Sequence, residues 1–178
     1  MKSNIALIGF MGAGKSTVGR ALAKKLGIEF VEMDALVVQH SGKTISQIFG
    51  QGGEARFRQL ESEVVAQVAG GSNAVLACGG GIILKQENID RLKKTSVIIY
   101  LSTEPSVILK RVKEGKVRRP LLEVDDPVTA VDKLIKFRRP LYTAAADITV
   151  DTSELTIEQV VERICSELKK NESYNFKK

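Results

Sequence analysis

The sequence predicts an α/β fold in which a parallel β-sheet is covered by helices on both faces. Three observations predict this fold. Short apolar runs alternate with segments of helical periodicity along the chain, which favours a parallel sheet with right-handed crossovers. Several of the apolar runs are continuous, as is typical of strands buried on both faces. A glycine-rich segment joins the first run to the first helix, in the pattern of a phosphate-binding loop.

The predicted strands and helices follow from these runs and from helix-end residues. Five strands are predicted, at residues 4–8, 29–33, 74–78, 96–101 and 147–150. Helices are predicted at residues 15–26, 35–39, 45–49, 54–68, 86–92, 105–113, 127–139 and 156–168. Thr44 is expected to cap a helix, and residues 50–53 are expected to form a flexible break.

Length and composition predict one globular domain over residues 1–178. The chain is 43% hydrophobic and 27% charged, as in ordinary globular proteins. No apolar run is long enough to span a membrane, and the first residues do not resemble a secretion signal. Cys78 and Cys165 match no metal or disulfide spacing, so we expect a reducing, cytoplasmic location.

Charge and histidine content narrow the possible functions. The formal net charge of +6 suits anionic ligands, but basic residues do not cluster with aromatic ones, so nucleic acid is not an expected partner. His40 is the only histidine, which disfavours histidine-based catalysis.

The segment from Gly9 to Ser16 has the spacing G-x-x-x-x-G-K-[ST]. Its glycines let backbone amides approach phosphate oxygens at the positive N-terminus of the next helix. Lys15 supplies a positive charge for the β- and γ-phosphates, and Ser16 supplies a hydroxyl for Mg²⁺. An ordinary glycine turn between a strand and a helix is the alternative interpretation.

Two further segments directly follow predicted strands. Asp34 follows the second strand, and Gly79, Gly80 and Gly81 follow the third. Ligands of parallel α/β sheets bind at the carboxyl ends of the strands. The P-loop, Asp34 and the three glycines are therefore expected at one edge of the sheet.

From residue 4 to about residue 168 the chain resembles the shikimate kinase family, small P-loop kinases related to nucleoside monophosphate kinases. The resemblance rests on the P-loop, Asp34, Phe57-Arg58 with Glu61, the three glycines, Arg-Pro-Leu-Leu at 119–122 and Arg-x-Pro-Leu-Tyr at 138–142. It implies a three-layer α/β/α fold with sheet order 2-3-1-4-5. It also implies transfer of the γ-phosphoryl group of ATP to the 3-hydroxyl of shikimate, with Mg²⁺, in aromatic amino acid biosynthesis.

The resemblance also assigns the nucleotide-binding residues. Lys15 and Arg119 would act on the transferring phosphoryl group, with Arg119 in a lid at about residues 114–126. Arg111 would lie against adenine, and Ser16 and Glu32 would contact Mg²⁺. The remaining nucleotide contacts implied are Gly12, Ala13, Gly14 and Thr17.

The acceptor residues implied by the resemblance lie mostly in a segment at about residues 34–70. Arg58 and Arg138 would bind the shikimate carboxylate, since guanidinium groups pair with carboxylates through two hydrogen bonds. Glu61, three residues after Arg58, would hold that arginine in place. Asp34 and the glycines Gly79, Gly80 and Gly81 would contact the ring and its hydroxyls.

Several alternatives stay open. Asp34 either acts as a general base, positions the hydroxyl or caps a helix, and Arg139 competes with Arg138 as the carboxylate ligand. Many relatives have aspartate where this chain has Glu32, and residues 152–155 lack the proline that relatives often place against adenine.

Other functions are also open. The chain could be a gluconate- or nucleotide-type kinase, or a non-catalytic nucleotide-binding regulator. We expect a monomer with no membrane partner and a frayed tail at residues 170–178.

Overall fold

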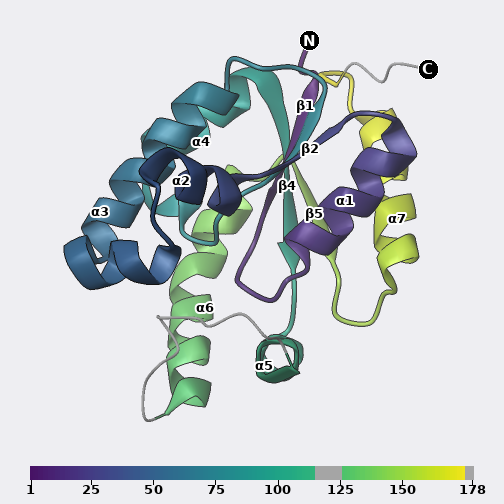
Figure 1. The fold of residues 1–178 in the computed structure, drawn as a ribbon. Helices are drawn as coiled ribbons and strands as arrows, with labels where there is room; N and C mark the ends of the chain where they lie inside the picture. Colours follow the sequence, from purple (N-terminus) through teal and green to yellow (C-terminus); the bar gives the residue numbers. More distant parts are fainter. Residues whose placement is uncertain (115–125, 175–178) are drawn as a thin grey trace.

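The computed structural model of the protein describes residues 1–114 and 126–174, and within them it forms a five-stranded parallel sheet in the order β2-β3-β1-β4-β5. Figure 1 shows helices on both faces of this sheet. The predicted α/β fold and strand order are confirmed. In chain order the elements are β1 (Asn4–Ile8), α1 (Lys15–Leu26), β2 (Glu29–Glu32), α2 (Met33–Ser41), α3 (Ile45–Val68), β3 (Ala74–Ala77), the 3₁₀-helix η1 (Ile82–Leu84), α4 (Gln86–Thr95), β4 (Ser96–Ser102), α5 (Pro105–Glu114), α6 (Pro127–Ala145), β5 (Ile148–Asp151) and α7 (Ile157–Lys170).

Two hydrophobic layers form the core, one on each face of the sheet. In β1, Ala6 and Ile8 face the layer packed by α2, α3, α4 and α6, whereas Ile5 and Leu7 face the layer packed by α1 and α7. This alternation follows from the two-residue period of side chains along a strand. Because both faces are covered, the central strands are apolar throughout, as the continuous runs predict.

The start of α3 agrees with the predicted cap at Thr44, and the structure adds a second cap at Thr156, which the sequence predicts as the first residue of a helix. Thr44 accepts a hydrogen bond from the Gln47 amide, while the Gln47 side chain accepts one from the Thr44 amide. Thr156 and Gln159 form the same reciprocal arrangement at the start of α7. These capping boxes satisfy backbone donors that the first helical turn leaves free.

The structure refines two predicted helix boundaries around the segment at about residues 34–70, where the acceptor residues are expected. Helix α2 begins at Met33, directly after β2, with Glu32 at its N-cap position, so the interpretation of Asp34 as a helix cap is wrong. The break predicted at residues 50–53 is narrower than expected: α3 consists of two helical parts joined at a kink, where Gly53 has a non-helical φ of 63° and ψ of −169°. Glycine tolerates this positive φ without the strain that a side chain would add.

Helix α6 continues past the predicted end at residue 139 and ends at Ala145, with Pro140 inside it. Proline removes one helical hydrogen bond and usually bends or ends a helix. Here Tyr142 and Ala145 are buried in the core, and their packing sustains the last turns of the helix.

The C-terminal segment is more ordered than predicted. Helix α7 continues to Lys170, and the Lys2 amide donates to the Ser173 carbonyl at 2.8 Å, so the prediction of fraying is wrong for residues 171–174. The last described residues consequently lie beside the start of β1, as the yellow end of the ribbon shows in Figure 1. Residues 175–178, and residues 115–125 of the predicted lid, lie outside the described residues.

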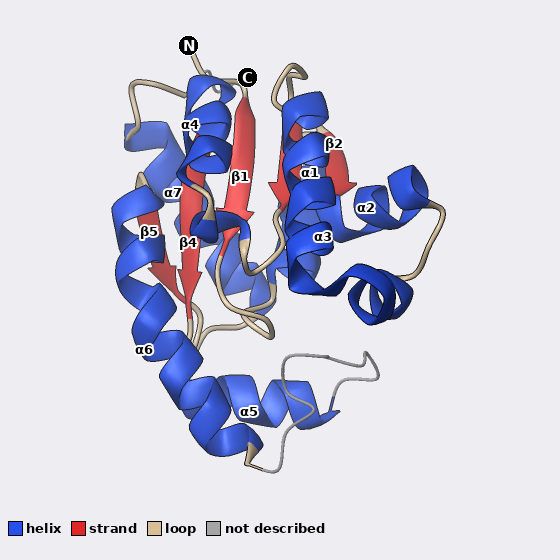
Figure 2. Ribbon diagram, turned by 90° about the vertical axis from the view of Figure 1, so that its left-hand side faces the viewer, coloured by secondary structure: helices blue, strands red, loops and turns tan. Residues whose placement is uncertain are grey.

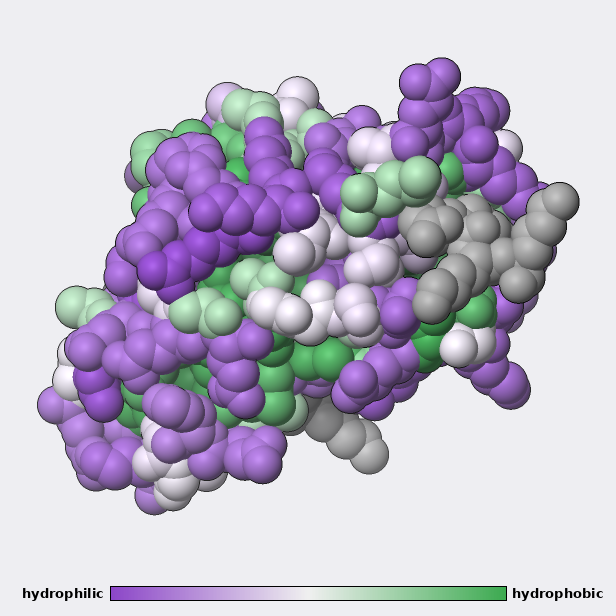
Figure 3. All heavy atoms as spheres, turned by 90° about the horizontal axis from the view of Figure 1, so that it is seen from above, coloured by the Kyte–Doolittle hydropathy of each residue, from purple (hydrophilic) through white to green (hydrophobic). Residues whose placement is uncertain are grey.

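Within the described residues, no helix is both long and apolar enough to cross a membrane. Seen from above, at the amino ends of the strands, hydrophilic residues cover most of the surface, with small apolar areas between them (Figure 3). Cys78 and Cys165 are both buried and unbonded to each other, and they belong to different hydrophobic layers. They therefore form no disulfide with each other in this structure.

The substitution Thr44→Ala is expected to lower the free energy of unfolding by about 1 kcal/mol, because it removes the cap of α3. Urea denaturation measures this change. Ser46→Ala is the matched control, since Ser46 is exposed in the first turn of the same helix. Equal stability of the two variants would contradict the capping role.

Candidate active site

A cleft of about 400 Å³ opens at the carboxyl ends of β1, β2 and β3. The sheet register places Glu32 beside Ala77 and Ala77 beside Leu7, so the segments that follow these strands are neighbours. In Figure 2, α2 and α3 lie on one side of this edge, and α5 and the lower part of α6 lie on the other. The cleft is lined by the P-loop, Glu32, Asp34, Cys78, Gly79, Gly80 and Arg111.

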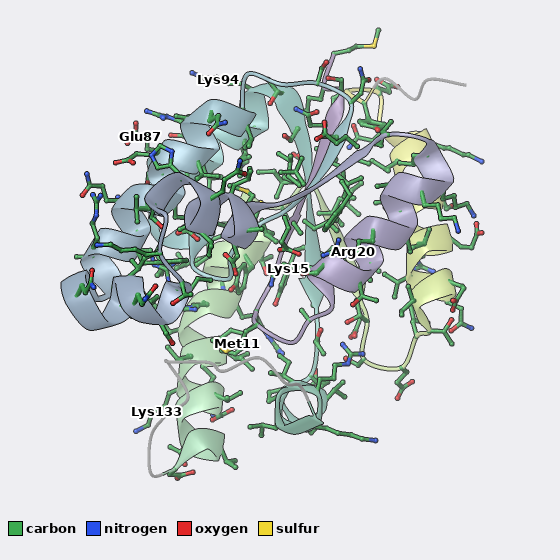
Figure 4. The ribbon with its side chains drawn as sticks, viewed as in Figure 1. Met11, Lys15, Arg20, Glu87, Lys94 and Lys133 are labelled. Carbon is green, nitrogen blue, oxygen red and sulfur yellow. The ribbon has the colours of Figure 1, made fainter. Side chains whose placement is uncertain are left out.

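The P-loop depends on glycine at two positions. At Gly9, whose φ is 149°, a Cβ atom would lie 2.6 Å from the Leu101 carbonyl oxygen. Gly14 has φ 92° and precedes the first turn of α1. Lys15 donates to the carbonyls of Gly9 and Phe10 at 2.9 and 3.0 Å, so its ammonium group lies over the loop (Figure 4). The loop therefore brings backbone amides and a positive charge to the cleft.

At the other end of the P-loop, Arg111 joins it to the segment after β5. Its guanidinium donates to the Gly12 carbonyl at 3.4 Å and to the Thr152 carbonyl at 3.1 Å. The Thr152 hydroxyl is buried, and it lies 2.8 Å from the Thr103 hydroxyl. Arg111 thus borders the cleft where the resemblance expects adenine, and residues 152–155 begin beside it.

Two carboxylates from the β2–α2 junction reach the cleft beside Ser16. Glu32 and Asp34 both line it, and Glu32 lies 3.8 Å from Arg20 of α1. Among the residues that the structure describes, no group of three or more His, Cys, Asp and Glu side chains is arranged to hold a metal ion. The donor set present is one hydroxyl, of Ser16, and two carboxylates, of Glu32 and Asp34, which suits a hydrated ion that is held mainly by phosphates.

Arg58 is buried on α3 between two carboxylates. Its Nη1 donates to Glu61 Oε2 at 2.9 Å, while its Nε and Nη2 donate to Glu54 Oε1 at 3.1 and 2.9 Å. The predicted pairing of Arg58 with Glu61 is confirmed. Spacings of three and four residues place all three side chains on one face of the helix. Burial lowers the pKa of Arg58, but Glu61 and Glu54 raise it by more, so the guanidinium stays charged.

Glu61 is the most buried of these charged side chains. Only 2% of the residue is exposed, and its Oε1 atom has no hydrogen-bond partner in the described part of the chain. Burial raises the pKa of Glu61, and Arg58 offsets part of that increase. A buried carboxylate oxygen without a donor is uncommon and indicates a place for a ligand donor.

The three glycines pass close to these charges. A Cβ at Gly79 would lie 2.5 Å from Glu61 Oε1 and 3.0 Å from Asp34 Oδ1. A Cβ at Gly81 would lie 2.1 Å from the Arg58 guanidinium carbon. Within the described residues the amide groups of Gly79, Gly80 and Gly81 donate to no acceptor. The turn therefore brings free amides next to a carboxylate pair and a guanidinium.

Arg138 and Arg139 face different surroundings. Arg138 is 4% exposed, with its guanidinium 5.8 Å from the centre of the Phe10 ring, and its Nε has no hydrogen-bond partner among the described residues. Arg139 is about half exposed and lies 3.7 Å from Glu104. Of the two, the structure brings Arg138 to the interior beside the P-loop.

Sequence reasoning missed two residues of this site. Glu54 stands four residues before Arg58 within the predicted helix 54–68, and this spacing, which suggests an ion pair on a helix, is the signal that could have found it. Tyr142 donates its hydroxyl to the Gly80 carbonyl, and no pattern in the sequence connects those two positions. Arg119 lies outside the described residues.

Comparison with known proteins identifies relatives of this arrangement. The family described as shikimate kinase matches residues 11–169. The shikimate kinase of Thermodesulfovibrio yellowstonii is 44% identical over 92% of this chain and 94% of its own. The shikimate kinase of Symbiobacterium thermophilum is 43% identical over 93% of this chain and 95% of its own. The structure of a shikimate kinase from Acinetobacter baumannii in complex with shikimate superposes with a TM-score of 0.91, at 37% identity, over 97% of this chain and 96% of that one.

The substitution Gly81→Ala is expected to lower the free energy of unfolding by about 1–3 kcal/mol relative to Gly80→Ala, because its Cβ must displace the buried Arg58 guanidinium. At Gly80 the nearest atoms to a Cβ lie 3.5 Å away, an ordinary contact, so Gly80→Ala is the control. Urea denaturation without ligands measures both. Equal stabilities would show that Arg58 is not held against the turn.

Proposed function

The chain belongs to the shikimate kinase family, and on that premise we propose which of its residues carry out the reaction. The enzyme transfers the γ-phosphoryl group of ATP to the 3-hydroxyl of shikimate, which yields shikimate 3-phosphate and ADP. The reaction needs two things from the protein: a site for the phosphates and a site that aims one hydroxyl at them.

One observation supports the acceptor site most strongly. Beside the P-loop, a buried carboxylate oxygen of Glu61 and the buried Nε of Arg138 both lack partners in the described chain, and the nearby glycine amides are free. Buried polar atoms normally find partners, so this combination fits a ligand with hydroxyl donors and a carboxylate acceptor. Shikimate carries both.

We place the shikimate carboxylate at Arg58 and Arg138. Both guanidinium groups are buried, which strengthens charge-assisted hydrogen bonds relative to the same contacts in water. Glu61 and Glu54 restrain Arg58 before the substrate arrives, so less conformational entropy is lost on binding. The ring would then lie along Gly79, Gly80 and Gly81, where the absence of side chains leaves room.

Asp34 lies between the glycine turn and the P-loop. Its Oδ1 is 3.0 Å from the position of a Cβ at Gly79, and it shares the cleft with Lys15. We propose that Asp34 orients the 3-hydroxyl towards the γ-phosphate. In a loose phosphoryl-transfer transition state, positioning and charge stabilisation supply most of the acceleration, so the proposal does not require Asp34 to remove the proton early.

The phosphates would be held by the amides of the P-loop segment 12–17 and by Lys15. Ser16 and Glu32 are the residues placed to hold Mg²⁺, the hydroxyl directly and the carboxylate through water. When bound with ATP, Mg²⁺ supplies positive charge to the phosphate oxygens. Arg111 would flank adenine, and Arg119 would stabilise charge on the transferring group, an assignment that rests on the family resemblance.

We also propose that the enzyme acts as a monomer in the cytoplasm, with no nucleic-acid or membrane partner. The two buried, unbonded thiols support a reducing compartment.

The substitution Arg58→Ala is expected to raise the KM for shikimate by about 10- to 100-fold, since hydrogen bonds between charged groups contribute about 1.5–3 kcal/mol. The KM for ATP should change little. A coupled assay of ADP release, with each substrate varied, measures both. Arg56→Ala is the control, because Arg56 is exposed on the same helix. Equal increases in both KM values would remove Arg58 from the acceptor site.

The substitution Lys15→Met is expected to reduce kcat at least about 100-fold, because it removes a positive charge that faces the transferring phosphoryl group. The exposed Lys24 of α1 provides the control Lys24→Met. Turnover is followed as ADP released with ATP, Mg²⁺ and shikimate, against ATP and Mg²⁺ alone. A near-normal kcat in Lys15→Met would contradict the assigned role.

A further inference from the structure

Tyr142 connects helix α6 to the glycine turn. Only 1% of the residue is exposed, and its hydroxyl donates to the Gly80 carbonyl oxygen at 2.5 Å. Its ring stacks on Tyr100 of β4, with the ring centres 5.0 Å apart and the planes 18° apart. A buried phenol needs a partner for its hydroxyl, and Gly80 provides it.

The direction of the Gly80 carbonyl determines the direction of the Gly81 N–H, because both belong to the same peptide group. The peptide bond is planar and trans, so the Gly81 N–H points opposite to the Gly80 C=O. With the carbonyl bound to Tyr142, this N–H is directed away from α6. Gly81 itself lies against the Arg58 guanidinium, and its amide has no acceptor in the described chain.

The same helix carries one of the proposed carboxylate ligands. Arg138 precedes Tyr142 by four residues, so both side chains lie on one face of α6. Burial raises the pKa of Tyr142, and the nearby Arg138 offsets only part of this increase. The phenol therefore remains protonated at neutral pH and continues to donate its hydrogen bond.

We propose that Tyr142 is a positioning residue for the phosphoryl acceptor. Its hydroxyl orients the Gly80–Gly81 peptide so that the Gly81 amide faces bound shikimate, and it holds the glycine turn at a fixed position relative to Arg138. This inference deepens the proposed acceptor site and rests on it. A phenylalanine would fill the same space and stack equally well, but it would leave the Gly80 carbonyl unbound and the peptide free to rotate.

The test is Tyr142→Phe, which removes one oxygen atom and keeps the ring. The KM for shikimate is expected to rise about three- to tenfold, the effect of one net hydrogen bond, while the KM for ATP changes less than about twofold. Tyr100→Phe is the matched control, because it removes the hydroxyl from the other ring of the same stacked pair. A similar rise in Tyr100→Phe, or a parallel rise in both KM values of Tyr142→Phe, would overturn the proposal.

The Arg58→Ala variant separates this proposal from the acceptor site itself. If Arg58→Ala raises the KM for shikimate and Tyr142→Phe does not, the site stands and the positioning role of Tyr142 is refuted. If neither variant changes that KM, the acceptor site is wrong and the role of Tyr142 fails with it.

A measurement on the unsubstituted protein tests the same claim without any variant. Amide hydrogen exchange of ¹⁵N-glycine-labelled protein is expected to slow at least about tenfold at Gly81 when shikimate binds, because the amide gains an acceptor. Unchanged exchange at Gly81 in the presence of saturating shikimate would refute the proposed orientation.

Discussion

A guanidinium group held between two carboxylates organises the proposed acceptor site of this enzyme. Arg58 is bound by Glu61 and Glu54 on its own helix, and its guanidinium packs directly against Gly81 of the glycine turn. Breaking a buried ion pair by removing one partner is strongly destabilising, because it leaves an uncompensated charge. The three residues therefore form one unit, which packs against the glycine turn and holds Arg58 at the proposed carboxylate site.

The sheet topology explains why this unit lies beside a nucleotide-binding loop. Strand β3 is inserted between β2 and β1, so the segments after these strands converge at one edge. The P-loop, the start of α2 and the glycine turn arrive there from separate parts of the sequence. Helix α6, a fourth part of the sequence, adds Arg138 and Tyr142. The proposed phosphate and acceptor sites can thus share one cleft, although their residues come from distant parts of the chain.

Much of this arrangement could be predicted from the sequence, because much of it is encoded locally. Apolar runs, the P-loop spacing and the cap at Thr44 each depend on a few neighbouring residues. The structure differs from the prediction where contacts between distant parts of the chain determine where an element ends. Helix α6 continues through Pro140 because Tyr142 and Ala145 are buried, and residues 171–174 are ordered by Lys2. The contact of Tyr142 with Gly80 joins positions far apart in the chain, and no local pattern encodes it.

The most direct test of the account is a crystal structure of this protein with shikimate, ADP and Mg²⁺. The account predicts the shikimate carboxylate within hydrogen-bonding distance of Arg58 and Arg138, and the 3-hydroxyl beside Asp34, facing the P-loop. A complex in which the carboxylate lies away from both arginines would contradict the acceptor site, even if ADP occupied the P-loop as expected.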